Sequence, residues 1–268
     1  MLSVCATPIG NLDDVTLRVL AELKAADVVL AEDTRHTRTL LERHGIRAKL
    51  VSYHEHNEAA RVAELLPRLA AGERMALVSD AGMPGISDPG IRLISAARDA
   101  EIEVTVLPGP SAVETALVAS GLDATRYAFL GFLPRRRAEL NALWRELARW
   151  TWPAVAFESP RRLPASLRSL AEADPARPVA VCRELTKRFE DVVRAGAVEA
   201  AARFAEPPRG EITLVIGGTV SSSGPDGRDA ARAAVAELVA AGTPRRVAAE
   251  VVARLTDVAK NDLYRATL

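Results

Sequence analysis

Four polar or glycine- and proline-rich loops, each directly after a short aliphatic run, are the segments of this sequence best able to do chemistry. They have the sequences TPIGN (7–11), EDTRH (32–36), SDAGMPGISDPG (79–90) and PGPS (108–111). Glycine lets the backbone approach a ligand closely, and proline stiffens the turn around it. Such loops can hold a small molecule through main-chain groups, and EDTRH adds carboxylates and an imidazole suited to acid–base chemistry.

Glycine and proline also punctuate ordinary strand-to-helix turns, and that explanation suffices for any one of the shorter loops. The loop at residues 79–90 is different, because its three glycines and two prolines exceed what a simple turn requires. We therefore expect this loop to contact a ligand.

The charged segments support more than one interpretation. Asp33 or Thr34 suits the N-cap of the following helix, while Arg35 and His36 would still point toward the mouth of the sheet. The HEHN segment at 54–57 invites a metal-site interpretation. Histidines at i and i+2 do not share a helical face, and the sequence suggests no third ligand, so we expect no metal.

The loops must be positioned by the elements around them. In the first half, the expected strands cover residues 2–6, 27–31, 49–51, 75–79 and 103–107. The expected helices cover residues 16–25, 37–44, 57–71, 90–100 and 111–120. Strand and helix in repetition are typical of the α/β class, with a parallel sheet covered on both faces. Such sheets bind ligands beyond the carboxyl ends of their strands, where these loops lie.

A second block of elements begins near residue 121. Its expected strands cover residues 127–132, 154–157, 179–182, 191–195 and 212–216, and its expected helices cover residues 138–149, 163–172 and 198–204. We predict an N-terminal α/β domain at 1–120, a second α/β domain at 121–218, a Ser-, Gly- and Pro-rich linker at 219–227 and a small helical appendage at 228–268. The helices expected in the appendage cover residues 228–241, 244–255 and 260–266.

Composition and absent motifs exclude several classes of function. The net charge is zero, so an RNA or DNA partner requires a local basic patch. Basic side chains cluster at residues 135–137, 161–162 and 183–188, where they would favour phosphate contacts unless they only form a solvated surface. The sequence has no GxGxxG, GxxxxGKS/T, HExxH, CxxC or GxSxG, which disfavours dinucleotide enzymes, P-loop NTPases, zinc sites and α/β-hydrolases.

Two further features concern the cellular compartment. Cys5 and Cys182 lie in apolar runs, so we expect buried free thiols. The sequence shows no signal peptide, and no apolar stretch approaches the roughly 20 residues of a membrane-spanning helix. We therefore expect a soluble, cytoplasmic protein without membrane contact.

Longer strings in the chain point to one family. They are TPIGNLDDVTLR (7–18), AEDTRHTRTLL (31–41), HEHNE (54–58), VSDAGMPGISDPG (78–90), LPGPSA (107–112), GFLPR (131–135), FESPRRL (157–163), RELTK (183–187) and RGEITLVI (209–216). In content and order, the chain resembles the bacterial 16S ribosomal RNA (cytidine 2′-O) methyltransferase I family, a branch of the tetrapyrrole (corrin/porphyrin) methylase superfamily.

The resemblance implies two α/β domains, with the methyl donor S-adenosylmethionine in the cleft between them, and a homodimer. The implied reaction is methyl transfer to the ribose 2′-hydroxyl of a cytidine in 16S rRNA, either free or within the small ribosomal subunit. The residues that the resemblance places at the donor are Pro8, Asp80, Ala81, Gly82, Met83, Pro84, Ile86, Ser111, Ala112, Phe157, Arg183 and Ile212.

Four charged residues are candidates for the chemistry itself. A ribose hydroxyl is a poor nucleophile near neutral pH, so a base or a cation beside it would help once the reactants are aligned. We expect Glu32 or Glu184 to accept the proton. We expect Lys187 or Arg35 to orient the substrate. Structural ion pairing among the same side chains is an equally open interpretation.

The chain departs from the usual strings of this family at Met83, where threonine is common beside the donor, and at Arg161 and Phe189. Two other functions stay open, namely a carbon or nitrogen methylase of the tetrapyrrole type and a protein that senses S-adenosylmethionine or RNA without turnover. The EDTRHT and HEHNE strings favour the RNA branch over the first. Retention of both the donor loop and RELTK favours turnover over the second.

Overall fold

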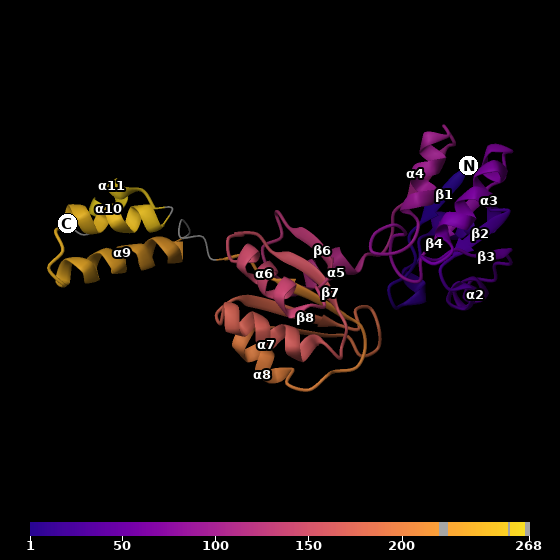
Figure 1. Ribbon diagram of the computed structural model, residues 1–268. Helices are drawn as coiled ribbons and strands as arrows, with labels where there is room; N and C mark the ends of the chain where they lie inside the picture. Colours follow the sequence, from indigo (N-terminus) through magenta and orange to yellow (C-terminus); the bar gives the residue numbers. More distant parts are fainter. Residues whose placement is uncertain (220–224, 257, 266–268) are drawn as a thin grey trace.

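Two five-stranded sheets carry the fold in a computed structural model of the chain, which describes residues 1–219, 225–256 and 258–265 (Figure 1). The strands of the first sheet are β1 (Leu2–Cys5), β2 (Val28–Ala31), β3 (Leu50–Ser52), β4 (Met75–Val78) and β5 (Val104–Leu107). All of its strand pairs are parallel, in the order β3-β2-β4-β1-β5. Every residue of β1, β2 and β4 is buried, as expected for a parallel sheet with both faces covered.

Helices from the first half of the chain cover these two faces. They are α1 (Leu17–Ala25), α2 (Thr34–Arg43), α3 (Glu58–Ala70) and α4 (Ile91–Asp99), with a short 3-10 turn at Leu12–Asp14. Helices α3 and α4 share one core cluster with Leu2 and Val4, whereas α1 and α2 share another with Cys5. The division follows from the alternation of side chains along β1.

The second sheet is mixed and has the order β6-β7-β10-β8-β9. Its strands are β6 (Ala128–Phe132), β7 (Ala154–Glu158), β8 (Pro178–Arg183), β9 (Asp191–Gly196) and β10 (Ile212–Ile216). Strand β6 is parallel to β7, and the remaining pairs are antiparallel. One face packs on α6 (Arg137–Leu147), α7 (Leu163–Ala173) and α8 (Ala197–Arg203). These two sheets and their helices confirm the α/β class.

The other face of the second sheet packs on helix α5 (Ala112–Ser120). Its Val113, Ala116 and Leu117 share a core cluster with Val155 of β7 and Val215 of β10. We expected this helix to belong to the first domain, ending at residue 120. The packing instead places the boundary in the loop between β5 and α5, because α5 buries its apolar side chains on the second sheet.

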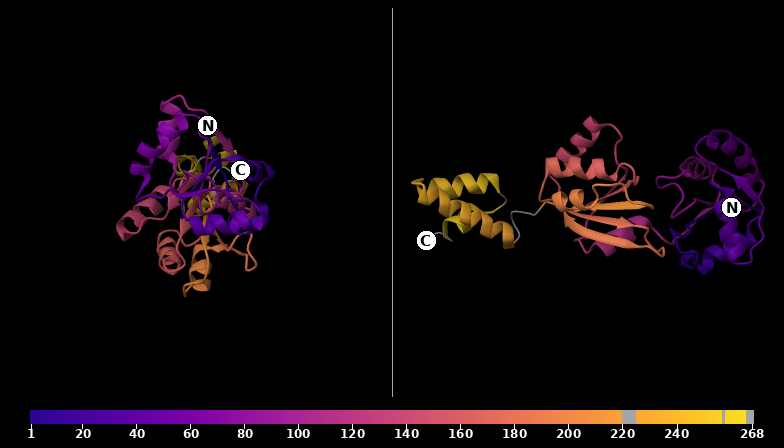
Figure 2. Two further views of the ribbon diagram at one scale, coloured as in Figure 1. Left: turned by 90° about the vertical axis from the view of Figure 1, so that its right-hand side faces the viewer. Right: turned by 90° about the horizontal axis from the view of Figure 1, so that it is seen from below.

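Three helices follow the second sheet, and they are α9 (Pro225–Ala240), α10 (Arg245–Leu255) and α11 (Lys260–Arg265). They bury a small core of their own, which includes Val235 and Leu263, and lie apart from both sheets (Figure 2, right). Most of the linker that we predicted at 219–227 lies outside the described residues, but α9 already begins at Pro225. Proline suits the first turn of a helix, because its fixed φ is close to the helical value. The backbone N–H that it lacks would have no hydrogen-bond acceptor within the helix at that position.

The predicted strands are confirmed, and most helix ends differ by no more than two residues from their predicted positions. Helix α2 begins at Thr34 rather than at the expected Thr37. Asp33 explains the earlier start, because its carboxylate accepts a hydrogen bond from the Arg35 backbone N–H and caps the helix. Across the described residues, no helix is both long and apolar enough to span a bilayer.

Candidate functional site

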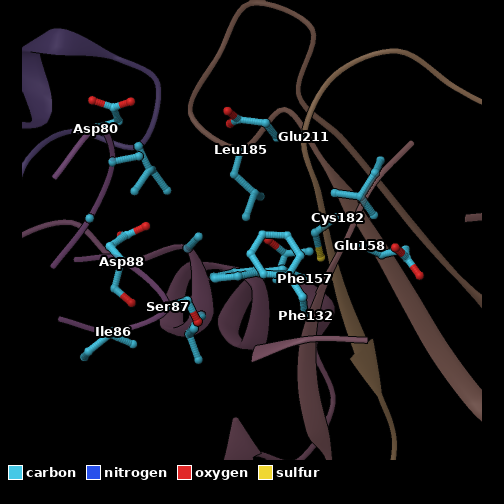
Figure 3. A pocket seen from close by; sticks show the side chains of 18 of the residues that line it. Asp80, Ile86, Ser87, Asp88, Phe132, Phe157, Glu158, Cys182, Leu185 and Glu211 are labelled. Atoms are coloured by element: carbon cyan, nitrogen blue, oxygen red, sulfur yellow. The ribbon is translucent and has the colours of Figure 1, made fainter. Parts of the chain in front are cut away.

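A cavity of about 500 Å³ lies between the two sheets, beyond the carboxyl ends of β2 and β4 (Figure 3). Its first wall consists of Ile9, Glu32, Asp80, Ala81, Gly82, Met83, Ile86, Ser87 and Asp88. Its second wall consists of Phe132, Phe157, Glu158, Ser159, Pro160, Cys182, Leu185, Gly210, Glu211, Ile212 and Thr213, and Ser111, Ala112 and Val113 join the two walls. The volume is typical of pockets that bind small molecules and cofactors.

Most residues expected at the donor line this cavity. They are Asp80, Ala81, Gly82, Met83, Ile86, Ser111, Ala112, Phe157 and Ile212. Pro8 and Pro84 do not line it and are buried within their loops. The side chain of Arg183 is also turned away, since its guanidinium lies 3.5 Å from Asp191 Oδ2 and donates to the Arg209 carbonyl. Proline stiffens the backbone behind the wall, and Arg183 holds two strands of the second sheet together.

The loops after β1 and β4 are tied to each other under the cavity. Thr7 and Gly82 exchange both backbone hydrogen bonds, at 2.8 and 3.0 Å. The Thr7 hydroxyl also donates to the Ser79 carbonyl at 3.0 Å. Asp80 extends the connection to the loop after β2, because its carboxylate accepts from the Asp33 backbone N–H at 3.0 Å. Three loops that are far apart in the sequence therefore form one polar floor.

Glu58, which the sequence did not indicate as part of the site, holds the far end of the loop at 79–90. It is buried, and its Oε1 accepts from the Tyr53 hydroxyl at 3.0 Å and from the Gly90 backbone N–H at 2.8 Å. A carboxylate hidden beneath a glycine-rich loop restricts the motion of that loop. The HEHNE string contains this residue, but only the fold brings it under Gly90.

Three carboxylates, Glu32, Asp80 and Asp88, face the cavity from the first domain. Burial raises the pKa of Glu32, and the nearby Asp80 carboxylate raises it further. Burial, together with the carboxylates of Glu32 and Asp80, raises the pKa of Asp88 to about 7. Carboxyl groups with raised pKa values can exchange protons near neutral pH.

The side chain of Arg35, which we expected to orient substrate, does not reach the cavity. It is 86% exposed and forms a two-pronged pair with Asp33, with its Nη2 2.6 Å from Asp33 Oδ2. Hydrogen bonds from Arg35 hold the pKa of Asp33 well below its usual range. Asp33 therefore caps the start of α2, and Arg35 forms an ion pair with it. This agrees with the alternative that these side chains have a structural role. His36 lies nearer the floor, with Nδ1 3.9 Å from Asp80 Oδ2.

The turn after β8 carries Glu184 and Lys187, and neither side chain lines the cavity. Lys187 Nζ donates to Glu184 Oε1 at 3.0 Å and to Glu211 Oε2 at 2.8 Å. The Glu211 backbone N–H and Lys187 both donate to Glu184 and lower the pKa of its carboxyl. These hydrogen bonds to the Glu184 carboxylate stabilise the turn. Leu185 is the residue of the turn that lines the cavity.

The same turn is strained and closely packed. Glu184 and Thr186 have φ of 53° and 64°, a region that costs free energy for residues other than glycine. Thr186 Oγ1 accepts from the Asn11 backbone N–H at 3.0 Å, which joins the two domains. A Cβ at Gly10 would lie 2.6 Å from Lys187 Cγ, so this close approach requires glycine.

An aromatic cluster forms part of the second wall. Phe157 stands edge-on to Phe129 and Phe132, with ring centroids 5.0 and 5.5 Å away. Phe132 lines the cavity and is 62% exposed, so its ring is available to a planar ligand. From the sequence we expected Phe132 only in a strand, although it belongs to the GFLPR string.

Two sulfur-containing residues also line the cavity. Met83 packs against the core cluster that contains Leu2 and Val4, so its side chain makes apolar contact there. Burial raises the pKa of the Cys182 thiol to about 12, which keeps it protonated and unreactive near neutral pH. Both cysteines are buried and free, as predicted.

Comparison with known proteins connects this geometry to a family. Residues 1–202 match the family model of the tetrapyrrole (corrin/porphyrin) methylases. Proteins called ribosomal RNA small subunit methyltransferase I are similar over the whole chain. The relative from Synechocystis is 41% identical, covering 100% of this chain and 97% of its own length. The relative from Mycobacterium tuberculosis is 46% identical, covering 98% and 93%.

The chain belongs to the tetrapyrrole methylase family, in its ribosomal RNA small subunit methyltransferase I branch. The resemblance seen in the sequence is thereby confirmed.

Solved structures agree on the fold. The methyltransferase CobJ superposes with a TM-score of 0.63 at 21% identity, covering 81% of this chain and 94% of its own. A uroporphyrin-III C-methyltransferase from Thermus thermophilus, complexed with S-adenosyl homocysteine, gives a TM-score of 0.57 at 21% identity, covering 81% and 96%. The chain therefore shares its fold with these two methyltransferases.

Proposed function

We propose that this protein transfers a methyl group from S-adenosylmethionine to the ribose 2′-hydroxyl of a cytidine in 16S rRNA. It is an S-adenosylmethionine-dependent methyltransferase by family. The observation that carries the RNA substrate is full-length similarity, at 41–46% identity, to proteins called ribosomal RNA small subunit methyltransferase I. The strings EDTRHT and HEHNE support the same branch, and the first contributes Glu32 to the floor of the cavity.

The cavity fits the methyl donor in size and chemistry. Apolar side chains such as Ile9, Val113 and Ile212 line it, together with backbone from the loop at 79–90. Carboxyl groups at Asp80 and Asp88 suit a ligand that carries positive charge. The bound donor supplies a sulfonium-activated methyl group. We assign its recognition to the loop at 79–90, to Ser111 and Ala112, and to Phe157 and Ile212.

We propose Glu32 as the proton acceptor. As the ribose oxygen bonds to the methyl carbon, the bond between carbon and sulfur breaks, the electron pair stays on sulfur, and the hydroxyl proton must leave. Glu32 is half-buried at the cavity floor, and burial raises its pKa toward the range where a general base works best. Glu184, the other candidate, is hydrogen bonded to Lys187 and the Glu211 backbone.

The remaining candidates act by positioning. Lys187 and Glu184 brace the turn that presents Leu185 to the cavity. Arg35 secures Asp33 at the start of α2, and the Asp33 backbone N–H contacts Asp80. Replacing Lys187 by alanine should accordingly lower donor affinity as well as turnover, and a fall in turnover alone would return Lys187 to a direct role.

A labelling experiment tests the reaction class. The purified protein would be incubated with tritiated S-adenosylmethionine and, separately, unmethylated small ribosomal subunits, bare 16S RNA or uroporphyrinogen III. We expect label in the RNA of one or both of the first two samples. Label in the tetrapyrrole alone would contradict the proposal, and donor binding without any transfer would favour a sensor.

A further inference from the structure

A second hollow, of about 470 Å³, lies on the second domain between α6 and α7, which pack side by side (Figure 1). Four arginines line it, against a single carboxylate, Glu172. The full lining consists of Arg135, Arg137, Leu140, Arg162, Ala165, Ser166, Arg168, Ser169 and Glu172. Such a concentration of guanidinium groups is unexpected in a chain whose net charge is zero and indicates an anionic ligand.

Much of this positive charge is not neutralised. Within the described part of the chain, Arg135 and Arg168 have no carboxylate partner, and both are exposed. Arg137 lies 3.3 Å from Glu172, but the two side chains are 77% and 65% exposed, so solvent weakens that pair. Helix α6 begins at this hollow without a side-chain N-cap, and its first backbone N–H groups add to the positive potential.

Arg162 connects the hollow to the donor cavity. It lines the hollow and donates through Nη1 and Nη2 to the Leu133 carbonyl, at 3.1 Å each, and through Nη2 to the Pro134 carbonyl. Its Nη1 also lies 3.4 Å from Oε1 of Glu158, a buried residue that lines the donor cavity. Glu158 Oε2 accepts in turn from Ser166 of the hollow at 2.6 Å. The hollow and the cavity are thus separated by a common wall, which contains Glu158, Arg162 and Ser166.

We infer that this arginine-lined hollow binds a backbone phosphate of the RNA, beside the nucleotide whose ribose enters the donor cavity; the inference rests on the function proposed above. Guanidinium groups bind phosphate oxygens through paired hydrogen bonds. A strand that places a ribose at the cavity carries phosphates on both sides of it, and the common wall brings one of them to the hollow. Phosphate contacts of this kind set the position of the strand rather than its sequence.

The test compares Arg135→Ala, Arg168→Ala and the double variant with Arg203→Ala. Arg203 is an exposed arginine of α8 outside the hollow, so its removal changes the net charge by the same amount as each single variant. Binding of 16S RNA would be measured across salt concentrations, donor affinity by calorimetry, and KM and kcat with unmethylated small subunits. We expect the KM for RNA to rise about tenfold in the double variant, with kcat and donor affinity within about twofold of wild type.

The salt dependence separates a phosphate contact from a loss of structure. Losing one phosphate contact should reduce the slope of log affinity against log salt concentration by about 0.7–0.9, and Arg203→Ala should leave that slope unchanged. Wild-type slope and KM in the double variant would overturn the inference, as would an equal loss in Arg203→Ala. If wild type methylates no RNA, the proposed function fails, and the inference is then decided by the binding slopes alone.

Discussion

Among single side chains, that of Glu32 has the most direct role in the proposed reaction, as the proton acceptor in the cavity. It follows β2 directly, lines the donor cavity and lies near Asp80, whose charge raises its pKa along with burial. The sequence identified Glu32 as a candidate because it belongs to a charged segment that directly follows an expected strand. It identified Glu184 equally. In the structure Glu32 lines the cavity, whereas Glu184 does not and is hydrogen bonded to Lys187 and the Glu211 backbone.

Replacing Glu32 by glutamine should lower kcat by about 100-fold or more, because the amide cannot accept the ribose proton. Donor affinity should change by less than about threefold. Glu42→Gln is a matched control, since Glu42 is an exposed residue of the helix that follows β2. Single-turnover methylation of small subunits would measure the effect, and a wild-type rate in Glu32→Gln would remove this residue from the mechanism.

Asp88 should make stability depend on pH. Its pKa is about 7, against an ordinary value of 3.8, so the folded protein binds this proton more tightly than the unfolded chain. The contribution of Asp88 to stability is therefore present at low pH and is lost as pH rises from about 4 to 7. Asp88→Asn should raise Tm relative to wild type more at pH 8 than at pH 5.

Thermal unfolding of the free protein at both values measures this difference. Asp14→Asn, at an exposed aspartate of the same domain, provides the control. A Tm difference for Asp88→Asn that is the same at both pH values would contradict the raised pKa.

At the scale of elements, the turn after β8 depends on how closely it approaches the loop after β1. The sequence predicted both strands, because buried aliphatic runs are local features. It could not predict the turn itself, whose φ values at Glu184 and Thr186 are maintained by partners in distant segments, including Asn11 and Glu211. Gly10 is where this long-range packing can be tested.

Gly10→Ala should destabilise the protein by about 1–3 kcal/mol and weaken donor binding, because the added methyl group would displace the turn that carries Leu185. Gly196→Ala is the control, since a Cβ at Gly196 has only the Pro175 carbonyl within 4 Å, at 3.8 Å. Urea unfolding and calorimetry would measure the two effects. Equal stability of both variants would show that the turn tolerates the methyl group.

Helix α5 illustrates a limit of local patterns. Its core-facing residues include Val113, Ala116 and Leu117, but its sequence is apolar overall and does not specify which sheet it covers. The fold places it on the second sheet, so the loop before it becomes the connection between domains. The same reasoning explains why Phe132 and Glu58 were missed, since each gains its role from a neighbour distant in the sequence.

At the scale of the whole molecule, the predicted homodimer can be tested by sedimentation. Val106 on the edge strand β5 and Val118 on α5 are 51% and 82% exposed, so both side chains are accessible to a second copy of the chain. We expect a species of twice the chain mass at micromolar concentration. A monomer under those conditions would contradict the predicted assembly.

Residues of both sheets line the cavity to which we assign the methyl donor, and we propose that a ribose oxygen of ribosomal RNA is methylated there. The most direct measurement is the position of the transferred methyl group. Unmethylated small subunits would be labelled with tritiated S-adenosylmethionine, and their RNA would be hydrolysed in alkali, which cannot cleave beside a methylated 2′-oxygen. We predict label in an alkali-stable dinucleotide that contains 2′-O-methylcytidine. Label on a base, or on a nucleotide that alkali releases, would contradict the account.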